Sequence, residues 1–125
     1  IYSTILLIVS LSSIGVPGLN GFIGEFLILI GSFKSPIYNN WIYTIVSTTG
    51  IIFAAVYLLW MYQRVVYGEV KHDNLYLLKD LNALEISTLV PLLIFIIWIG
   101  VQPNTFLSLT EVSVKSIIDF ALSFK

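Results

Sequence analysis

An acidic side chain lies among glycines inside an otherwise apolar stretch of this sequence. The segment GVPGLNGFIGEF, residues 15–26, contains one proline, four glycines and a single carboxylate, that of Glu25. Glu25 is also the only charged side chain between residues 1 and 33. A charge at the middle of a bilayer costs about 2.5 to 3.5 kcal/mol even on the translocon-insertion scale, so such residues usually face a bundle interior or a water path. Glu25 is therefore the first candidate for chemistry.

The carboxyl group of Glu25 is subject to two opposing effects. Desolvation in a membrane favours the neutral acid, whereas free N–H groups and the positive dipole end of a following helix favour the carboxylate. A carboxyl group held between them changes its protonation in response to modest changes around it, as a proton relay requires. The alternative is a structural role, in which Glu25 accepts hydrogen bonds from N–H groups freed by a helix break. Broken helices recur at ion sites of transporters, so the pattern indicates an ion-coupled membrane protein without specifying the cation.

The composition predicts an all-α membrane protein. Hydrophobic residues make up 58% of the 125 residues and charged residues only 10%, against about 25% charged residues in soluble domains. Several apolar stretches are long enough for membrane-spanning helices. A net charge of −1 argues against nucleic acid as a partner, which selects for clustered Lys and Arg. The absence of cysteine excludes disulfides and thiolate metal sites, and the single histidine, His72, is interpreted as an ordinary loop residue.

Residues 1–34 are predicted to form one transmembrane helix that is discontinuous at Pro17–Gly21. A straight helix of this length would measure about 50 Å at about 1.5 Å per residue, whereas the hydrocarbon core is about 30 Å thick. We expect half-helices at about 2–15 and 22–34. Unwound backbone at membrane depth is tolerated only inside protein or beside water, so this span should lie within a bundle. The residues assigned to the break are Pro17, Gly18, Gly21 and Gly24.

A second transmembrane helix is expected at residues 41–63. It follows a polar turn, carries no charge, and has aromatic residues near both ends, where interfacial belts form. Ser47, Gly50 and Ala54 recur at spacings of three and four and form a small-residue stripe on which another helix can pack closely.

The third transmembrane helix, expected at 84–101, begins with a capping box. Asn82 is the predicted N-cap, and Glu85 is placed to accept a hydrogen bond from the N–H of that cap. Glu85 therefore has a structural explanation. Gly100 and Pro103 are expected to end the helix.

The charges outside these spans predict a topology. Residues 64–83 form a loop on the cytoplasmic or matrix side, because basic residues concentrate on that side. Residues 105–124 are too polar to span a membrane, and their polar positions recur at spacings of three and four. They predict an amphipathic interfacial helix on the outer face. The loop contains half of the six basic residues, namely Arg64, Lys71 and Lys79.

Three long blocks of the sequence resemble one known family. They are GVPGLNGFIGEFLILIGSF, VYLLWMYQRVVYGEV and DLNALEISTLVPLLIFIIWIGVQPNTFL. Together they resemble the C-terminal part of the M-type, or chain 4, subunits of proton-pumping NADH:quinone oxidoreductase, respiratory complex I. The related L and N subunits carry Lys in the broken helix, whereas the M type carries Glu in a GEF context, which Glu25 matches.

This resemblance implies the last three spans of an antiporter-like membrane-arm subunit, in the mitochondrial inner membrane or the bacterial cytoplasmic membrane. Glu25 would be a relay on a proton path coupled to NADH oxidation by quinone. NADH, FMN, iron–sulfur clusters and quinone would bind elsewhere in the complex, and this chain would hold no cofactor or metal and carry no redox chemistry itself. Its partners would be neighbouring antiporter-like subunits, the rest of its own subunit, and lipid.

Several assignments stay open at this stage. A subunit of a multi-subunit Na⁺/H⁺ antiporter or of a membrane-bound hydrogenase would fit the same pattern, as would a purely structural piece of the membrane arm. The chain is expected to be the end of a longer protein or a separately encoded piece. Lys34 is interpreted as a residue whose amine extends to the membrane surface, with a charge near the proton exit as the alternative. Further candidates for lining a water path are Ser12, Ser13, Asn20, Ser47 and Thr48.

Overall fold

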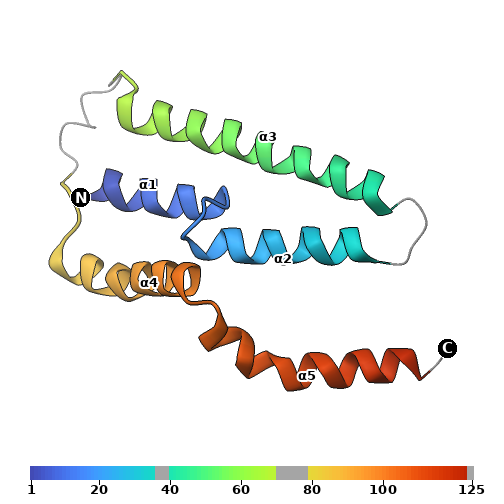
Figure 1. Cartoon of the computed structure of the whole chain (residues 1–125). Helices are drawn as coiled ribbons and strands as arrows, with labels where there is room; N and C mark the ends of the chain where they lie inside the picture. Colours follow the sequence, from blue (N-terminus) through green and yellow to red (C-terminus); the bar gives the residue numbers. More distant parts are fainter. Residues whose placement is uncertain (36–39, 70–78, 124–125) are drawn as a thin grey trace.

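Helices are the only regular elements in the part of the chain that the structure describes. The computed structural model describes residues 1–35, 40–69 and 79–123. The predicted turn residues 36–39, and Lys71 and His72 of the predicted loop, lie outside these ranges. The helices are α1 Tyr2–Ser13, α2 Asn20–Lys34, α3 Asn40–Tyr67, α4 Ala83–Val101 and α5 Asn104–Leu122 (Figure 1).

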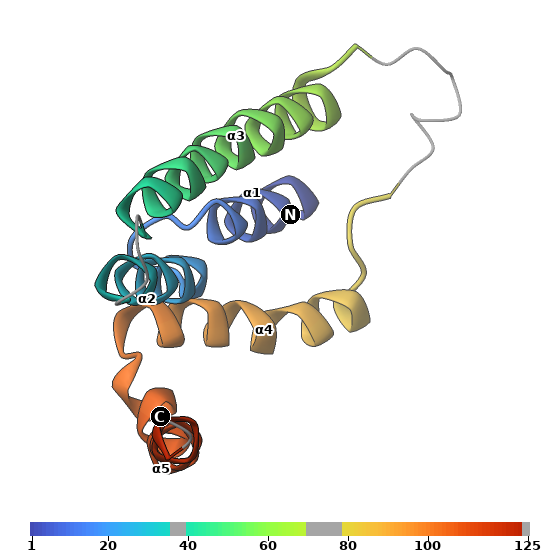
Figure 2. The same cartoon turned by 90° about the vertical axis from the view of Figure 1, so that its right-hand side faces the viewer.

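The two short helices α1 and α2 form the centre of the arrangement. They run in the same direction with a sideways step between them, and α3 runs back past both (Figure 1). Viewed from another side, α1 and α2 lie between α3 and α4 (Figure 2). Both α3 and α4 pack against each of the two short helices. The connection between α1 and α2 therefore lies between two long helices, with Pro17 and Gly18 exposed.

Two of the helices are long and apolar enough to cross a membrane, judged by length and composition within the described residues. They cover Trp41–Tyr67 in α3 and Ala83–Val101 in α4, and α1 is apolar but shorter. Their large apolar side chains are mostly exposed; Phe53, for example, is 69% exposed. Soluble monomers rarely expose large contiguous apolar patches. The exposed apolar faces of α3 and α4 are therefore suited to contact with lipid or with further protein.

The helix α3 extends beyond its predicted end at residue 63. It continues to Tyr67, so residues 64–67, which were assigned to the loop, are helical. The guanidinium carbon of Arg64 lies 4.1 Å from the centre of the Trp60 ring one turn earlier. Such a cation–π contact between residues i and i+4 stabilises an additional helical turn.

The predicted capping box at the start of α4 is confirmed. The N–H of Asn82 donates to Oε2 of Glu85 at 2.7 Å, and the N–H of Ala83 donates to Oδ1 of Asn82 at 2.7 Å. Two N–H groups at the helix start, which have no partner within the helix, are satisfied in this way. Glu85 thus has the structural role that the sequence indicated.

Asp80 connects the start of α1 to the segment that leads into α4. Its carboxylate accepts hydrogen bonds from the N–H of Tyr2 at 2.9 Å and from the N–H of Leu81 at 2.8 Å. This exposed carboxylate thereby links the start of α1 to the segment that leads into α4.

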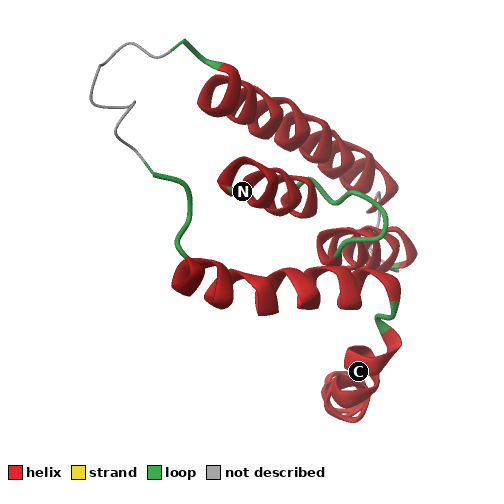
Figure 3. Cartoon of the chain, turned by 90° about the vertical axis from the view of Figure 1, so that its left-hand side faces the viewer, coloured by secondary structure: helices red, strands yellow, loops and turns green. Residues whose placement is uncertain are grey.

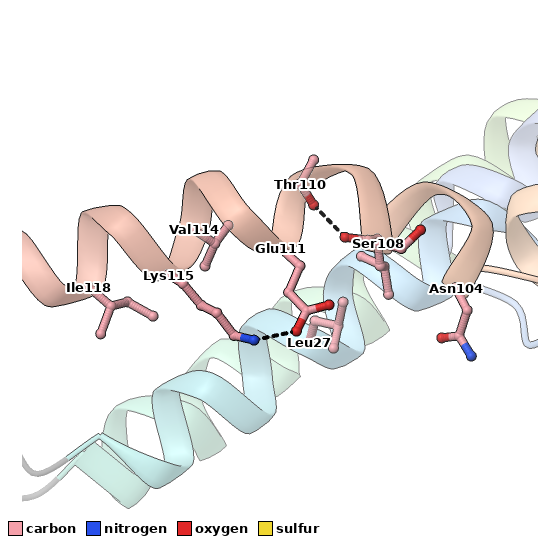
Figure 4. A pocket seen from close by; sticks show the side chains of 9 residues that line it. Leu27, Asn104, Ser108, Thr110, Glu111, Val114, Lys115 and Ile118 are labelled. Carbon is pink, nitrogen blue, oxygen red and sulfur yellow. Dashed lines mark hydrogen bonds and ion pairs between the residues drawn. The ribbon is translucent and has the colours of Figure 1, made fainter.

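The helix α5 extends from the end of α4, on the side away from α3 (Figure 3). It corresponds to the amphipathic helix predicted at 105–124. Leu27 of α2 and one face of α5 line a hollow of about 530 Å³ (Figure 4). On α5, Lys115 donates to Glu111 at 2.6 Å, an exposed pair one helical turn apart. Such pairs contribute little to stability. The large apolar side chains of α5 are mostly exposed, Leu109 for example by 77%.

Candidate functional site

The step between α1 and α2 is made by two glycines with left-handed backbone. The helix α1 ends at Ser13 and α2 begins at Asn20. Between them, Gly15 has φ +77° and Gly18 has φ +93°, values that side chains with a β-carbon rarely adopt. Because the chain turns at both residues, α2 begins beside the end of α1 instead of continuing its axis (Figure 1).

The break assigned from the sequence differs in detail from the observed one. Pro17 and Gly18 lie in the connection, as expected, whereas Gly21 and Gly24 lie inside α2. Gly21 nevertheless has a role at the junction. A β-carbon on it would collide with the main-chain oxygen of Ser12 and lie 3.6 Å from Cα of Gly15. The first turn of α2 therefore lies directly against the end of α1.

Two of the polar candidates from the sequence meet across this junction. The hydroxyl of Ser12 donates a hydrogen bond to Oδ1 of Asn20. Ser12 is almost completely buried, with 6% of its surface exposed. A buried hydroxyl needs such a partner, so this bond links the end of one helix to the start of the next.

The carboxyl group of Glu25 occupies the space beside Gly15. A β-carbon built on Gly15 would lie 2.9 Å from Cδ of Glu25, 3.3 Å from Oε1, and closer still to Oε2. Glu25 lies in the second turn of α2 and is half-buried. Across residues 1–35, 40–69 and 79–123, its carboxylate accepts no hydrogen bond. The capping role considered for Glu25 has no counterpart among these residues.

Glu25 also lines a hollow of about 270 Å³ between α2 and α3. The small-residue stripe of α3 forms its other wall, so Ser47, Gly50 and Ala54 lie opposite Glu25. Glu25 and Ser47 are the polar residues of this hollow, and the rest of its lining is apolar or glycine. The carboxyl group of Glu25 thus lies on an open hollow near the helix break.

Comparison with known proteins connects this geometry to a family. No family model matches the chain. Over 94% of its length, the chain is 39% identical to NADH-ubiquinone oxidoreductase chain 4 of Triticum aestivum and 38% identical to the protein of that name from Arabidopsis thaliana. Over 94% of its length it is also 38% identical to NADH-quinone oxidoreductase subunit M of Rickettsia felis. This chain is a homologue of chain 4 and subunit M. It spans about 23% of the length of each of these relatives.

The remaining candidates of this subunit M homologue lie away from Glu25 or have other contacts. Ser13 is exposed at the end of α1. Thr48 donates to the main-chain oxygen of Thr44 at 2.9 Å, within its own helix. Lys34 is in the last turn of α2 and lines a separate apolar hollow of about 330 Å³. Across the described ranges, no three His, Asp or Glu side chains are grouped as a metal site would require.

Two glycines at the junction were not assigned a site role from the sequence. Gly15 makes room for Glu25. Gly100, used only as a helix end, lies against the connection, because a β-carbon on it would be 2.5 Å from Cα of Leu19 and closer to the carbonyl group of Gly18. A glycine inside an apolar helix often marks a close approach of another backbone, a signal that the sequence analysis did not apply to Gly100.

Proposed function

We propose that this chain is part of an M-type membrane-arm subunit of proton-translocating NADH:quinone oxidoreductase, with Glu25 as a proton relay. The observation that carries the proposal is the place of the Glu25 carboxyl group, beside Gly15 at the junction of α1 and α2 and on the hollow that α3 lines. The names of the relatives favour this enzyme complex over a Na⁺/H⁺ antiporter or a hydrogenase.

In this proposal α1 and α2 are the two halves of one discontinuous transmembrane helix, and α3 and α4 are the other two spans. The break would place the Glu25 carboxyl group beside the end of α1 and on the hollow that α3 lines, where water would reach it. Water in the hollow beside Ser47 would deliver a proton to a Glu25 oxygen and accept it again. Because no hydrogen bond among the described residues holds the carboxylate, its side chain is free to change orientation between these steps.

The proposed setting is a multi-pass subunit in the mitochondrial inner membrane or the bacterial cytoplasmic membrane. Its partners would be the rest of its own subunit and the other membrane-arm subunits, with α5 on the outer face beside a neighbouring antiporter-like subunit. NADH, FMN, iron–sulfur clusters and quinone would bind elsewhere in the complex. The chain would contribute to enzyme activity through proton translocation alone.

The test is Glu25→Gln in the complete subunit within the assembled complex. Gln keeps the size and the hydrogen-bond acceptor of Glu but does not exchange a proton, so the complex should assemble and translocate fewer protons per NADH oxidised. Glu25→Asp keeps an exchangeable proton and should retain more translocation than Glu25→Gln. Glu85→Gln is the matched control, because it makes the same chemical change at the cap of α4 and should leave proton stoichiometry unchanged. Full stoichiometry in Glu25→Gln would refute the relay.

A further inference from the structure

Gly15 is the residue nearest to the carboxyl group of Glu25 across the helix break. The three heavy atoms closest to the position of a β-carbon on Gly15 all belong to the end of the Glu25 side chain. No main-chain atom of another element is among them. The space left by the missing side chain of Gly15 is therefore filled by the Glu25 carboxyl group.

We propose that Gly15 is a positioning residue for Glu25: its missing β-carbon is the space that admits the carboxyl group into the junction of α1 and α2. This inference rests on the proposed relay role of Glu25 and adds a second residue to it. Gly15 exchanges no proton itself. It determines where the exchanging group lies relative to the end of α1 and to the hollow that α3 lines.

The size of the displacement in a Gly15→Ala variant follows from the geometry. Carbon atoms reach their preferred separation at about 3.5 Å, whereas the new β-carbon would lie 2.9 Å from Cδ of Glu25. Cδ would have to retreat by at least about 0.6 Å, and Oε2, which lies closer, by more. Rotation about the Glu25 side-chain bonds achieves this without moving the backbone. The overlap with Glu25 is therefore relieved by displacement of the carboxyl group, and the strain of Ala in the left-handed backbone of Gly15 is a separate effect.

Gly18 provides a matched control for the backbone. It has a similar left-handed conformation, with φ +93° against +77° for Gly15. Ala is strained at both positions for the same reason. A β-carbon on Gly18 meets nothing within 4 Å, however. The difference between Gly15→Ala and Gly18→Ala therefore isolates the contact with Glu25 from the strain of the connection.

The experiment compares these two variants with Glu25→Gln and with the double variant Gly15→Ala/Glu25→Gln, all in the complete subunit of the assembled complex. One readout is the rate of proton translocation into membrane vesicles. The other is the infrared C=O stretching band of Glu25, defined as the band that Glu25→Gln removes. A misplacement of about 1 Å can cost up to about 100-fold in rate, so we expect a loss of roughly tenfold in Gly15→Ala relative to Gly18→Ala.

The expected pattern also includes a shifted carboxyl band in Gly15→Ala but not in Gly18→Ala. In the double variant, Gly15→Ala should add almost no loss to that of Glu25→Gln, because residues that act as a unit are non-additive. The inference is overturned if Gly15→Ala and Gly18→Ala agree in rate and band. It is also overturned if the two losses multiply in the double variant.

The two proposals are separated by their readouts. If Glu25→Gln translocates protons at the full rate, the relay role fails. In that case the infrared C=O band of Glu25, compared between Gly15→Ala and Gly18→Ala, decides whether Gly15 positions the carboxyl group. If Gly15→Ala does not assemble while Gly18→Ala does, the variant Gly15→Ala/Glu25→Ala tests the same contact. Removal of the Glu25 side chain frees the space, so assembly should return, and its failure to return would contradict the inference.

Discussion

The contact between Gly100 of α4 and the connection of α1 and α2 predicts a large effect from a single methyl group. In a Gly100→Ala variant the new β-carbon would lie 2.5 Å from Cα of Leu19. The nearest atoms are all main-chain atoms of residues 18 and 19, so no side-chain rotation relieves the overlap. The end of α4 would have to move away by about 1 Å to restore normal carbon contact.

The cost follows from two opposing contributions. Forcing an extra carbon into a close-packed contact costs about 1 to 3 kcal/mol. Ala is favoured over Gly inside a helix by about 0.5 to 1 kcal/mol, which offsets part of this cost. We expect a net destabilisation of about 1 to 2 kcal/mol in the packing of α4 on the connection.

The assay is thermal unfolding of the purified membrane complex that carries the variant. Gly31→Ala is the control, because Gly31 is also a helical glycine and a β-carbon on it meets nothing within 4 Å. Gly100→Ala should lower the apparent midpoint of unfolding, whereas Gly31→Ala should leave it unchanged or raise it. Equal midpoints for the two variants would refute the close approach of α4.

Two further predictions concern the start of α4 and the hollow beside Glu25. Asn82→Ala removes the N-cap and should cost about 1 kcal/mol in helix stability, seen as faster amide hydrogen exchange at Ala83, whereas Asn82→Ser should keep most of the protection. Gly50→Leu should fill the hollow opposite Glu25 and reduce proton translocation while electron transfer to an artificial acceptor continues; Gly31→Leu is the control. An unchanged proton stoichiometry in Gly50→Leu would show that protons do not pass through this hollow.

Features encoded by neighbouring residues were predictable from the sequence. The capping box of α4 needs only Asn82 and Glu85, three positions apart, and the structure has both of its hydrogen bonds. The break between α1 and α2 was also located, because proline and glycine act on the backbone where they stand. The end of α3 was placed too early, at the first charged residue, whereas Arg64 stacks on Trp60 within the helix and Val65, Val66 and Tyr67 continue it.

Contacts between distant residues were not predictable in the same way. The space that Gly15 leaves has a purpose only because α2 begins beside α1 and directs Glu25 back toward the junction. The approach of Gly100 to residue 18 likewise depends on how α4 crosses the connection. The stripe of Ser47, Gly50 and Ala54 was identified from its spacing as a packing surface, but its position opposite Glu25 required the structure.

The packing of α3 on both α1 and α2 has a mechanical consequence. An interrupted helix is ordinarily a hinge, because its two parts are joined only by a flexible segment. Here the continuous helix α3 lies along both parts. The hydroxyl of Tyr62 donates a hydrogen bond to the main-chain oxygen of Ser3 in α1, and the hydroxyl of Thr44 donates one to the hydroxyl of Ser32 in α2. Bending at the connection would separate α1 or α2 from α3. In the proposed relay, the Glu25 side chain would therefore change its protonation without bending of the joint between α1 and α2.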